Sequence, residues 1–125
     1  MKKDTIIFIK HIIEGIESIE NFSKGISKTK FLRDELRQNA IIRKLEIIGE
    51  ATKNVPSSFR NKYPSIEWKR IASLRDKLIH NYFGVNLDRV WNIVKKDIPD
   101  LKKKIKVILE ETEKQSNIGN KPTAK

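Results

Sequence analysis

The chain has 125 residues, of which 38% are hydrophobic and 34% charged, which suits one small domain with a single core. Its 27 Lys and Arg against 16 Asp and Glu give a formal net charge of +11, which favours encounter with nucleic acid, an acidic protein or an anionic membrane without choosing among them. The lack of cysteine excludes disulfides and thiolate metal sites and fits a cytoplasmic location, and the lack of a run of about 18 apolar residues excludes a membrane-spanning helix.

Hydrophobic spacing predicts amphipathic helices along most of the chain. Over residues 4–22, isoleucines recur at intervals of three and four residues and fall on one broad arc of a helix. Glu20 falls inside this arc, where it either marks the rim of the stripe or pairs with a buried cation. Residues 28–54 carry the longest pattern of this kind and predict a second helix, which Pro56 ends. Gly49 inside that helix suggests that another backbone approaches closely there.

Shorter helices are expected in the second half of the chain. Residues 57–63 predict a short turn or a single helical turn. Residues 66–80 predict a third long helix with Ser65 as its N-cap. Residues 87–96 predict a fourth helix, and a turn at residues 97–99 leads into a last one.

These elements predict an all-α fold, an up-and-down bundle of four to five helices over residues 1–112. The polar residues 113–125 predict a disordered tail. Trp68 and Trp91 occupy positions that suit a core or an interface, and His11 lies at the edge of the apolar arc of the first helix.

One segment gathers the side chains best suited to acid–base chemistry. Within eight residues, Arg75, Asp76, His80 and Tyr82 supply a guanidinium, a carboxylate, an imidazole and a phenol. Asp76 and His80 are four residues apart, so on a helix the carboxylate can hydrogen-bond the imidazole, fix its tautomer and raise its pKa. An ordinary ion pair on a helix surface has the same spacing.

Arg75 and His80 are five residues apart, a separation of about 500° on an uninterrupted α-helix, so the two side chains would point roughly 140° away from each other. A straight helix therefore cannot aim both at one phosphate. Either the helix bends or ends before His80, or the site is assembled from two chains.

A phosphodiester of RNA held against these groups could be cleaved without a metal ion. The 2′-hydroxyl would attack the adjacent phosphorus, with His80 as general base or general acid and Arg75 binding the phosphate oxygens. One histidine cannot easily serve in both roles, and a symmetric dimer would supply a second copy. The two histidines of the chain lie far apart in sequence and show no metal-ligand spacing, and there is no glycine-rich phosphate loop, so we expect neither a metal nor a cofactor.

Several segments occur in a fixed order between about residues 4 and 110: Ile47-Ile48-Gly49-Glu50-Ala51, Tyr63-Pro64-Ser65-Ile66-Glu67-Trp68, Arg75-x4-His80-x-Tyr82, Phe83-Gly84-Val85 and Asp97-Ile98-Pro99-Asp100-Leu101. This ordered set resembles the HepT toxin family, within the HEPN superfamily of helical ribonucleases. The resemblance implies an all-helical homodimer in which the motif faces its copy across a cleft. It also implies a metal-independent endoribonuclease that arrests growth as the toxin of a type VII-like toxin–antitoxin system.

The same resemblance implies a partner and a modification. Such toxins are encoded beside a minimal nucleotidyltransferase antitoxin of the MntA kind, which transfers AMP to the motif tyrosine, here Tyr82. Added bulk and a negative phosphate near Arg75 and His80 would block the pocket and pair with the cation. Without such a modification, Tyr82 would be a packing aromatic with its hydroxyl at the surface.

Two other functions fit the sequence. The chain could be a non-catalytic dimeric docking partner of a nucleotidyltransferase, with the motif serving as a protein or nucleotide contact. It could also bind nucleic acid nonspecifically through its basic surface, which predicts a steep loss of affinity with salt and no strand scission. No base-reading element is recognisable, so the sequence does not specify which RNA would be cleaved.

Overall fold

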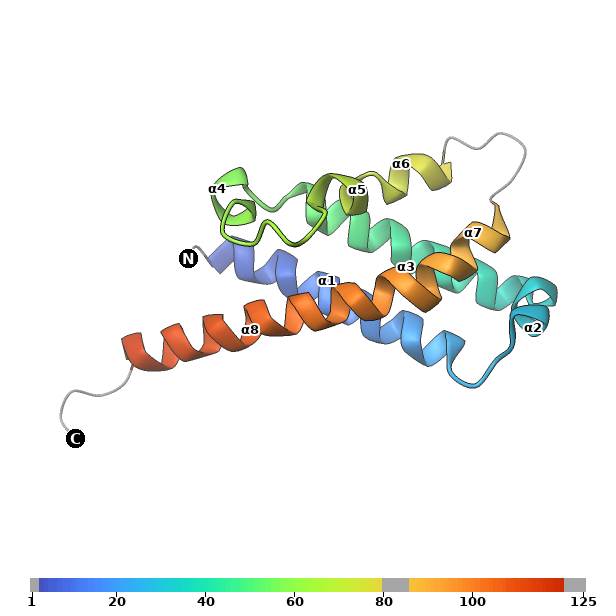
Figure 1. Cartoon of the computed structure of the whole chain (residues 1–125), viewed down its shortest axis with the longest axis horizontal. Helices are drawn as coiled ribbons and strands as arrows, with labels where there is room; N and C mark the ends of the chain where they lie inside the picture. Colours follow the sequence, from blue (N-terminus) through green and yellow to red (C-terminus); the bar gives the residue numbers. More distant parts are fainter. Residues whose placement is uncertain (1–2, 80–85, 121–125) are drawn as a thin grey trace.

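The computed structural model describes residues 3–79 and 86–120, apart from the side chains of Lys3, Arg75, Leu78, Ile79 and residues 115–120. These ranges are helical with no strand. Figure 1 shows that the chain runs back and forth along the long axis of the molecule, which confirms the predicted all-α, up-and-down bundle. The elements are α1 (Lys3–Ser23), α2 (Lys28–Arg33), α3 (Glu35–Lys53), α4 (Ser57–Arg60), α5 (Trp68–Ala72), α6 (Leu74–Ile79), α7 (Leu87–Asn92), the π-helical η1 (Ile93–Asp97) and α8 (Ile98–Asn120).

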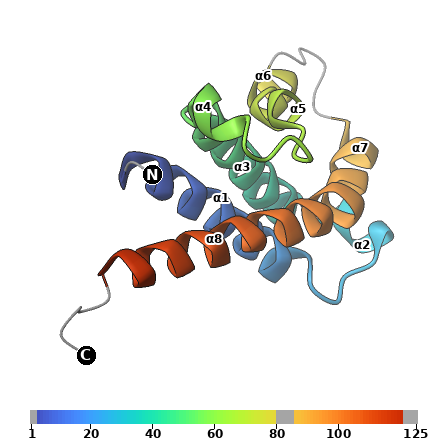
Figure 2. The ribbon, with the colours of Figure 1, turned by 60° about the vertical axis from the view of Figure 1, so that its left-hand side comes forward.

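The three long helices α1, α3 and α8 enclose most of the core, and α5 and α6 lie along α3 (Figures 1 and 2). Four isoleucines of the arc predicted for the first helix are fully buried, as are several apolar residues of α3 and of the first turns of α8, whereas Leu36 at the start of α3 is 84% exposed. Each buried side chain of this kind contributes about 1.5–3 kcal/mol on burial. The most deeply buried residues are Ile9, Ile12, Ile16, Ile19, Phe31, Ile41, Leu45, Ile48, Val90, Ile98, Ile105 and Ile108.

Two helices approach closely where α1 crosses α3. Gly15 of α1 is buried there, and a Cβ atom at this position would lie 2.7 Å from Cγ1 of Ile48 and 3.6 Å from the carbonyl oxygen of Lys44. The distance of 2.7 Å to Ile48 is shorter than van der Waals contact, and the fully buried Ile48 has little room to move. The absence of a side chain at Gly15 therefore sets how closely α1 and α3 pack.

The helix predicted over residues 28–54 is divided at Asp34, so this prediction was wrong about continuity. The Asp34 carboxylate accepts a hydrogen bond from the backbone N–H of Arg37 at 3.1 Å and caps α3. Its second oxygen accepts from Nε of Arg37 at 2.9 Å, while Nη1 of Arg37 donates to the carbonyl of Phe22 at 2.8 Å. Aspartate favours caps over helix interiors because its side chain competes for backbone N–H groups.

The helix predicted over residues 66–80 is likewise divided, at Ser73, and begins later than expected. Ser65 is not its N-cap: α5 begins at Trp68, and Glu67 precedes it without a side-chain cap. The indole Nε1 of Trp68 donates to the carbonyl of Tyr63 at 3.0 Å, which fixes the entry into α5. The hydroxyl of Ser73 donates to the carbonyl of Arg70 at 2.7 Å, where the chain changes from α5 to α6.

The turn predicted at residues 97–99 is absent, because α7 continues through η1 into α8. The backbone N–H of Ile98 donates to the carbonyl of Ile93, five residues earlier, which is the π-helical pattern. A proline inside an α-helix lacks an N–H and its ring collides with the carbonyl four residues before it. The wider η1 turn displaces that carbonyl and lets Pro99 lie within a nearly continuous helix.

At the C-terminal end, α8 continues to Asn120. The backbone of residues 113–120 is thus helical where the sequence predicts a disordered tail, and no proline interrupts the helix there. The division into a domain over 1–112 and a tail over 113–125 stays a prediction. Among the described residues, none of the helices is both long enough and apolar enough to cross a membrane.

Glu20, which lies inside the apolar arc of α1, pairs with a cation. Nζ of Lys102 in α8 lies 2.7 Å from Oε1 of Glu20, and both side chains are partly buried. Glu20 thus lies at the rim of the stripe, and the cation that it contacts is partly exposed rather than buried. The pair joins α1 to α8 at the edge of the core.

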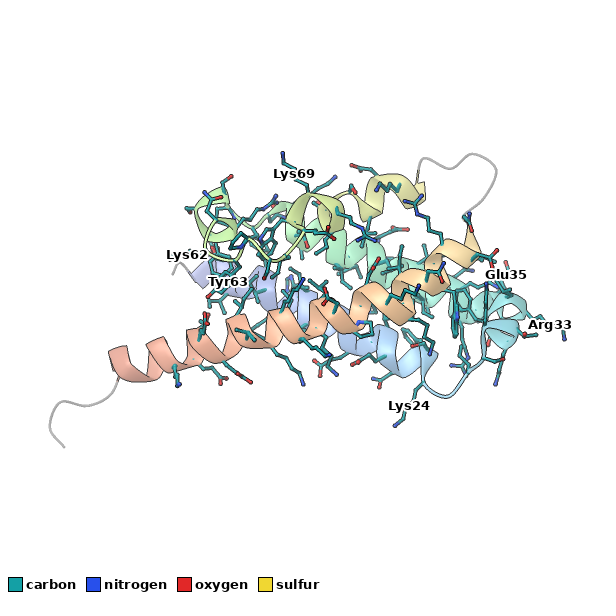
Figure 3. All side chains as sticks on the ribbon, viewed as in Figure 1. Lys24, Arg33, Glu35, Lys62, Tyr63 and Lys69 are labelled. Carbon is teal, nitrogen blue, oxygen red and sulfur yellow. The ribbon has the colours of Figure 1, made fainter. Side chains whose placement is uncertain are left out.

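Tyr63 ties the loop before α5 to the far end of α8. Its hydroxyl donates to Oε2 of Glu111 at 2.8 Å, and its place on the loop after α4 is labelled in Figure 3. Burial, followed by the hydrogen bond and negative charge of Glu111, raises the pKa of Tyr63 to about 12. The fold therefore favours the neutral phenol.

We predict that Gly15→Val lowers the free energy of unfolding by about 2 kcal/mol, because the added side chain must displace Ile48 or separate α1 from α3. Urea unfolding followed by circular dichroism measures this change. Glu14→Val is the matched control, since Glu14 is the exposed neighbour in the same helix. Equal losses from the two substitutions would show that the close contact does not limit packing.

We also predict that Tyr63 ionises well above the ordinary tyrosine pKa of about 10. The stabilisation of the neutral phenol is fully present below pH 10 and is lost as the pH rises towards about 12. Titration of tyrosinate absorbance in a Tyr82→Phe background isolates Tyr63, because the chain has 2 tyrosines. Glu111→Gln should lower this pKa only in part, since burial is the larger cause; an unshifted pKa in the parent would contradict the Tyr63–Glu111 contact.

Candidate active site

The first part of the predicted catalytic segment lies on α6. The backbone of Arg75 belongs to this helix, whereas its side chain lies outside the described part of the structure. His80 and Tyr82 also lie outside the described residues. The convergence of Arg75 and His80 on one phosphate and the role of Tyr82 therefore stay predictions.

Asp76, predicted to orient His80, contacts a cation from another helix. Nζ of Lys53, at the C-terminal end of α3, lies 3.2 Å from each carboxylate oxygen of Asp76. Both side chains are partly exposed, so this ion pair contributes little to stability. It nevertheless fixes the side of α6 that faces α3, and the predicted hydrogen bond from His80 to Asp76 stays a prediction.

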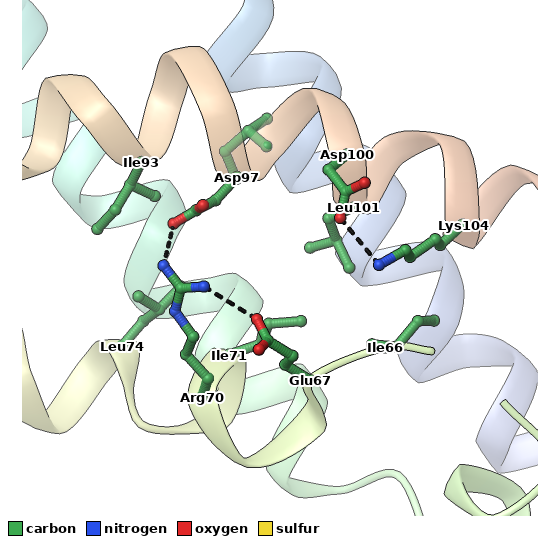
Figure 4. A pocket seen from close by; sticks show the side chains of 11 residues that line it. Ile66, Glu67, Arg70, Ile71, Leu74, Ile93, Asp97, Asp100, Leu101 and Lys104 are labelled. Carbon is green, nitrogen blue, oxygen red and sulfur yellow. Dashed lines mark hydrogen bonds and ion pairs between the residues drawn. The ribbon is translucent and has the colours of Figure 1, made fainter. Parts of the chain in front are cut away.

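A second ion-pair cluster holds α5, and with it the start of α6, against the C-terminal half of the chain (Figure 4). The guanidinium of Arg70 donates to Oε2 of Glu67 at 2.9 Å and to Oδ2 of Asp97 at 2.7 Å. The hydrogen bond that Arg70 donates to Glu67 and the negative charge of Asp97 raise the pKa of Arg70 above its ordinary value. Arg70 thus joins α5 to η1 a few residues before Arg75.

The other tie in this region comes from α8. Nζ of Lys104 donates to the carbonyl of Ser65 at 2.8 Å and pairs with Oδ2 of Asp100 at 2.9 Å. Arg70 and Lys104 thus flank a cavity of about 80 Å³ between α5 and α8. Binding sites for small molecules usually measure about 300–1,000 Å³, so this cavity suits a few waters rather than a substrate.

A more open hollow of about 330 Å³ lies between α1 and α3. His11 lines it and is exposed, which agrees with its predicted place at the edge of the apolar arc. Nη1 of Arg43 lies 3.5 Å from Oε2 of Glu46 on the same face. The described residues contain no group of three or more His, Cys, Asp or Glu side chains arranged to hold a metal ion.

The two tryptophans lie in the core, which was one of the two positions predicted for them. Trp68 and Trp91 are 6% and 9% exposed, which leaves little ring surface for stacking on a base. The ring of Trp91 lies 5.2 Å from that of Phe31, and Nζ of Lys95 lies 4.7 Å from the Trp91 ring. Trp91 thereby joins α7 to α2.

Neither Lys53, which contacts α6, nor Arg70, which ties α5 to η1, is recognisable from the sequence as a residue that holds these helices in place. The spacing of Glu67 and Arg70 is a recognisable i,i+3 pair on a helix. By contrast, no local pattern indicates that Arg70 meets Asp97 or that Lys53 meets Asp76, because these contacts span 27 and 23 residues.

Comparison with known proteins places most of the bundle in one family. The model of the family described as "Ribonuclease HepT-like" matches residues 12–108. A "Probable ribonuclease HepT" of Thermococcus cleftensis is 49% identical over 104 residues, which is 83% of this chain and 94% of that protein. A "Putative RNase" of Methanocaldococcus jannaschii is 46% identical over 112 residues, which is 90% of this chain and 93% of that protein.

A longer relative contains the same region. A "Gamma-glutamylcyclotransferase and putative RNase" of Methanocaldococcus jannaschii is 50% identical over 117 residues, which is 94% of this chain and 53% of that protein. The chain therefore spans about half the length of this relative. No solved structure matches the chain. The extent of the family match and the identity to these relatives show that the chain belongs to the ribonuclease HepT-like family.

Proposed function

We propose that the protein is a metal-independent endoribonuclease that cleaves RNA at a site assembled from two copies of the chain. The observation that carries this proposal is the family match over residues 12–108, which includes the intact Arg75-x4-His80-x-Tyr82 pattern. The ribonuclease names of its relatives support the substrate class. The ties of α5 and α6 to α3 and η1 support a fixed platform for Arg75.

The proposed reaction is an internal transfer at phosphorus. A base removes the proton from a ribose 2′-hydroxyl, and the 2′-oxygen forms a bond to the adjacent phosphorus. The bond from phosphorus to the 5′-oxygen breaks, and an acid protonates that oxygen. The products are a 2′,3′-cyclic phosphate and a 5′-hydroxyl, and DNA is not cleaved because it lacks the nucleophile.

His80 supplies the base and the acid, and Arg75 neutralises the extra negative charge on the phosphate oxygens in the transition state. Their spacing of five residues favours partners from two chains over a single helix. A twofold dimer would also bring two imidazoles to one phosphate, so that one accepts a proton while the other donates one. Asp76 of α6, which pairs with Lys53 of α3, would orient the imidazole.

We further propose that an MntA-like nucleotidyltransferase neutralises this toxin by modifying Tyr82. The Tyr82 oxygen would attack the α-phosphorus of ATP, form a phosphodiester to AMP and release pyrophosphate. The new phosphate carries a negative charge, which would pair with Arg75 and occupy the position of the RNA phosphate. Neutralisation then follows from blocking the substrate site.

We predict that His80→Ala lowers the rate of RNA cleavage by about 10²–10⁴-fold, and that Arg75→Ala lowers it by about 10²–10³-fold. The measurement is cleavage of total RNA by purified protein in EDTA, with the cyclic phosphate ends identified by mass spectrometry. His11→Ala is the matched control, because His11 is the other histidine and is exposed.

Three results would each contradict one part of the proposal: the roles of His80 and Arg75, the independence from metal ions, or catalysis itself. Cleavage that survives both substitutions would remove His80 and Arg75 from the reaction. Cleavage that EDTA abolishes would assign the chemistry to a metal ion. Binding of the nucleotidyltransferase with no cleavage by any preparation would favour the docking-partner function.

We predict that Tyr82 gains the mass of one AMP group when the protein is coexpressed with its nucleotidyltransferase. Mass spectrometry of the peptide that contains Tyr82 detects the change, and growth of the cells reports neutralisation. Tyr63→Phe is the control for the other tyrosine and should be modified normally at Tyr82. A neutralised toxin with unmodified Tyr82 would assign neutralisation to occlusion by the partner.

A further inference from the structure

A basic groove of about 250 Å³ lies between α6 on one side and α7 with η1 on the other. Figures 1 and 2 both show α6 and α7 at the same end of the bundle. Its cationic walls are formed by Lys77 of α6, Arg89 of α7 and Lys96 of η1, all exposed. Its apolar lining comes from the buried Leu74, Val90 and Ile93.

The cations of this groove are not neutralised by the rest of the described molecule. Lys77, Arg89 and Lys96 have no ion-pair or hydrogen-bond partner for their side-chain nitrogens among the described residues. The nearby carboxylates are already engaged, since Asp97 pairs with Arg70 and Asp88 lies 2.9 Å from Nζ of Lys28. Three like charges around one concavity repel each other and attract an anion.

The groove also offers neutral hydrogen-bond donors. The side-chain oxygen of Asn86 accepts from the backbone N–H of Arg89 at 3.1 Å, which leaves its amide NH₂ without a partner among the described residues. Asn92 also lines the groove, and its side chain has no described partner either. Amide donors between cations suit a chain of phosphate and sugar oxygens better than a single compact anion.

The position of the groove relates it to the candidate active site. One wall, α6, ends at Ile79, and the other wall begins at Asn86, the N-cap of α7. The walls are therefore the helices on either side of residues 80–85, which contain His80 and Tyr82. Asp76 faces α3, whereas Lys77, the next residue around α6, faces α7. The groove therefore lies on another side of α6 from Asp76 and suits nucleotides that flank a cleavage site.

We infer that this groove binds the sugar–phosphate backbone of single-stranded RNA beside the scissile bond. This inference rests on the proposed ribonuclease function, which supplies RNA as the occupant. Lys77, Arg89 and Lys96 each contact a phosphate, and Asn86 and Asn92 donate to oxygens between them. Contacts of this kind carry no base sequence, so the groove raises affinity for RNA of any sequence.

The test measures binding separately from cleavage. A fluorescent single-stranded RNA of about 16 nucleotides, the upper end of common single-strand site sizes, is titrated with full-length His80→Ala protein and followed by anisotropy at several salt concentrations. The triple variant Lys77→Gln, Arg89→Gln and Lys96→Gln should lower the slope of log affinity against log salt by about 2 and weaken binding about 100-fold near ~0.1 M salt.

The matched control removes the same charge elsewhere. Lys24, Lys62 and Lys106 are exposed and have no described ion-pair partner, and Figure 3 labels Lys24 and Lys62 away from α6 and α7. Their triple change to glutamine should leave the slope nearly unchanged. Thermal unfolding shows that both triple variants fold, and loss of mutual repulsion should leave the groove variant at least as stable as the parent.

The outcomes separate the groove from the proposed reaction. Equal losses in the groove variant and the control would overturn the inference, even if the wild-type protein cleaves RNA. A selective loss in the groove variant would support it, even if no preparation cleaves RNA, in which case the proposed reaction fails alone. Equally effective competition by poly-glutamate of matched charge would overturn it by assigning the groove to an acidic protein.

Discussion

The bundle depends on the close crossing of α1 and α3 at Gly15. Because Gly15 has no side chain, Ile48 can lie against the backbone of α1, and the isoleucine arc of α1 reaches the apolar face of α3. These two helices make the most extensive contact in the described structure. A larger residue at this crossing would separate them and loosen the surface on which the later helices pack.

α3 in turn supports the helices that carry the candidate site. Its far side packs against α5 and α6, and Lys53 at its end pairs with Asp76. Arg70 then ties α5, the helix before α6, to η1 through Asp97. Exposed ion pairs contribute little stability, and their role here is to fix the orientation of short helices.

The sequence allowed prediction of the parts of this fold that depend on periodicity. The isoleucine arc, the apolar stripes of the later helices and the burial of both tryptophans follow from spacing alone. It did not predict the breaks at Asp34 and Ser73 or the π-helical turn before Pro99, because each break depends on a few local hydrogen bonds. A cap or a wider turn changes the chain direction without changing the hydrophobic pattern.

The candidate site could be predicted as a set of residues but not as an arrangement. The types and spacing of Arg75, Asp76, His80 and Tyr82 indicate phosphodiester chemistry, and the family match supports this reading. The contact between Asp76 and Lys53 and the groove beside α7 bring together residues distant in sequence, so neither follows from a local pattern. The residues that position and extend the site are therefore recognisable only in the folded chain.

In the proposed reaction, Arg75 of one copy of the chain works with His80 of another. Mixing tests it directly: Arg75→Ala and His80→Ala proteins, each inactive alone, are unfolded together, refolded and assayed for RNA cleavage. In mixed dimers the His80→Ala chain supplies Arg75 and the Arg75→Ala chain supplies His80, so one complete pair is restored across the interface. Because a mixed dimer keeps only one His80 to act as base or acid, we expect cleavage well above the sum of the two separate proteins but below the wild-type rate. Activity no higher than the sum of the two separate proteins would contradict it.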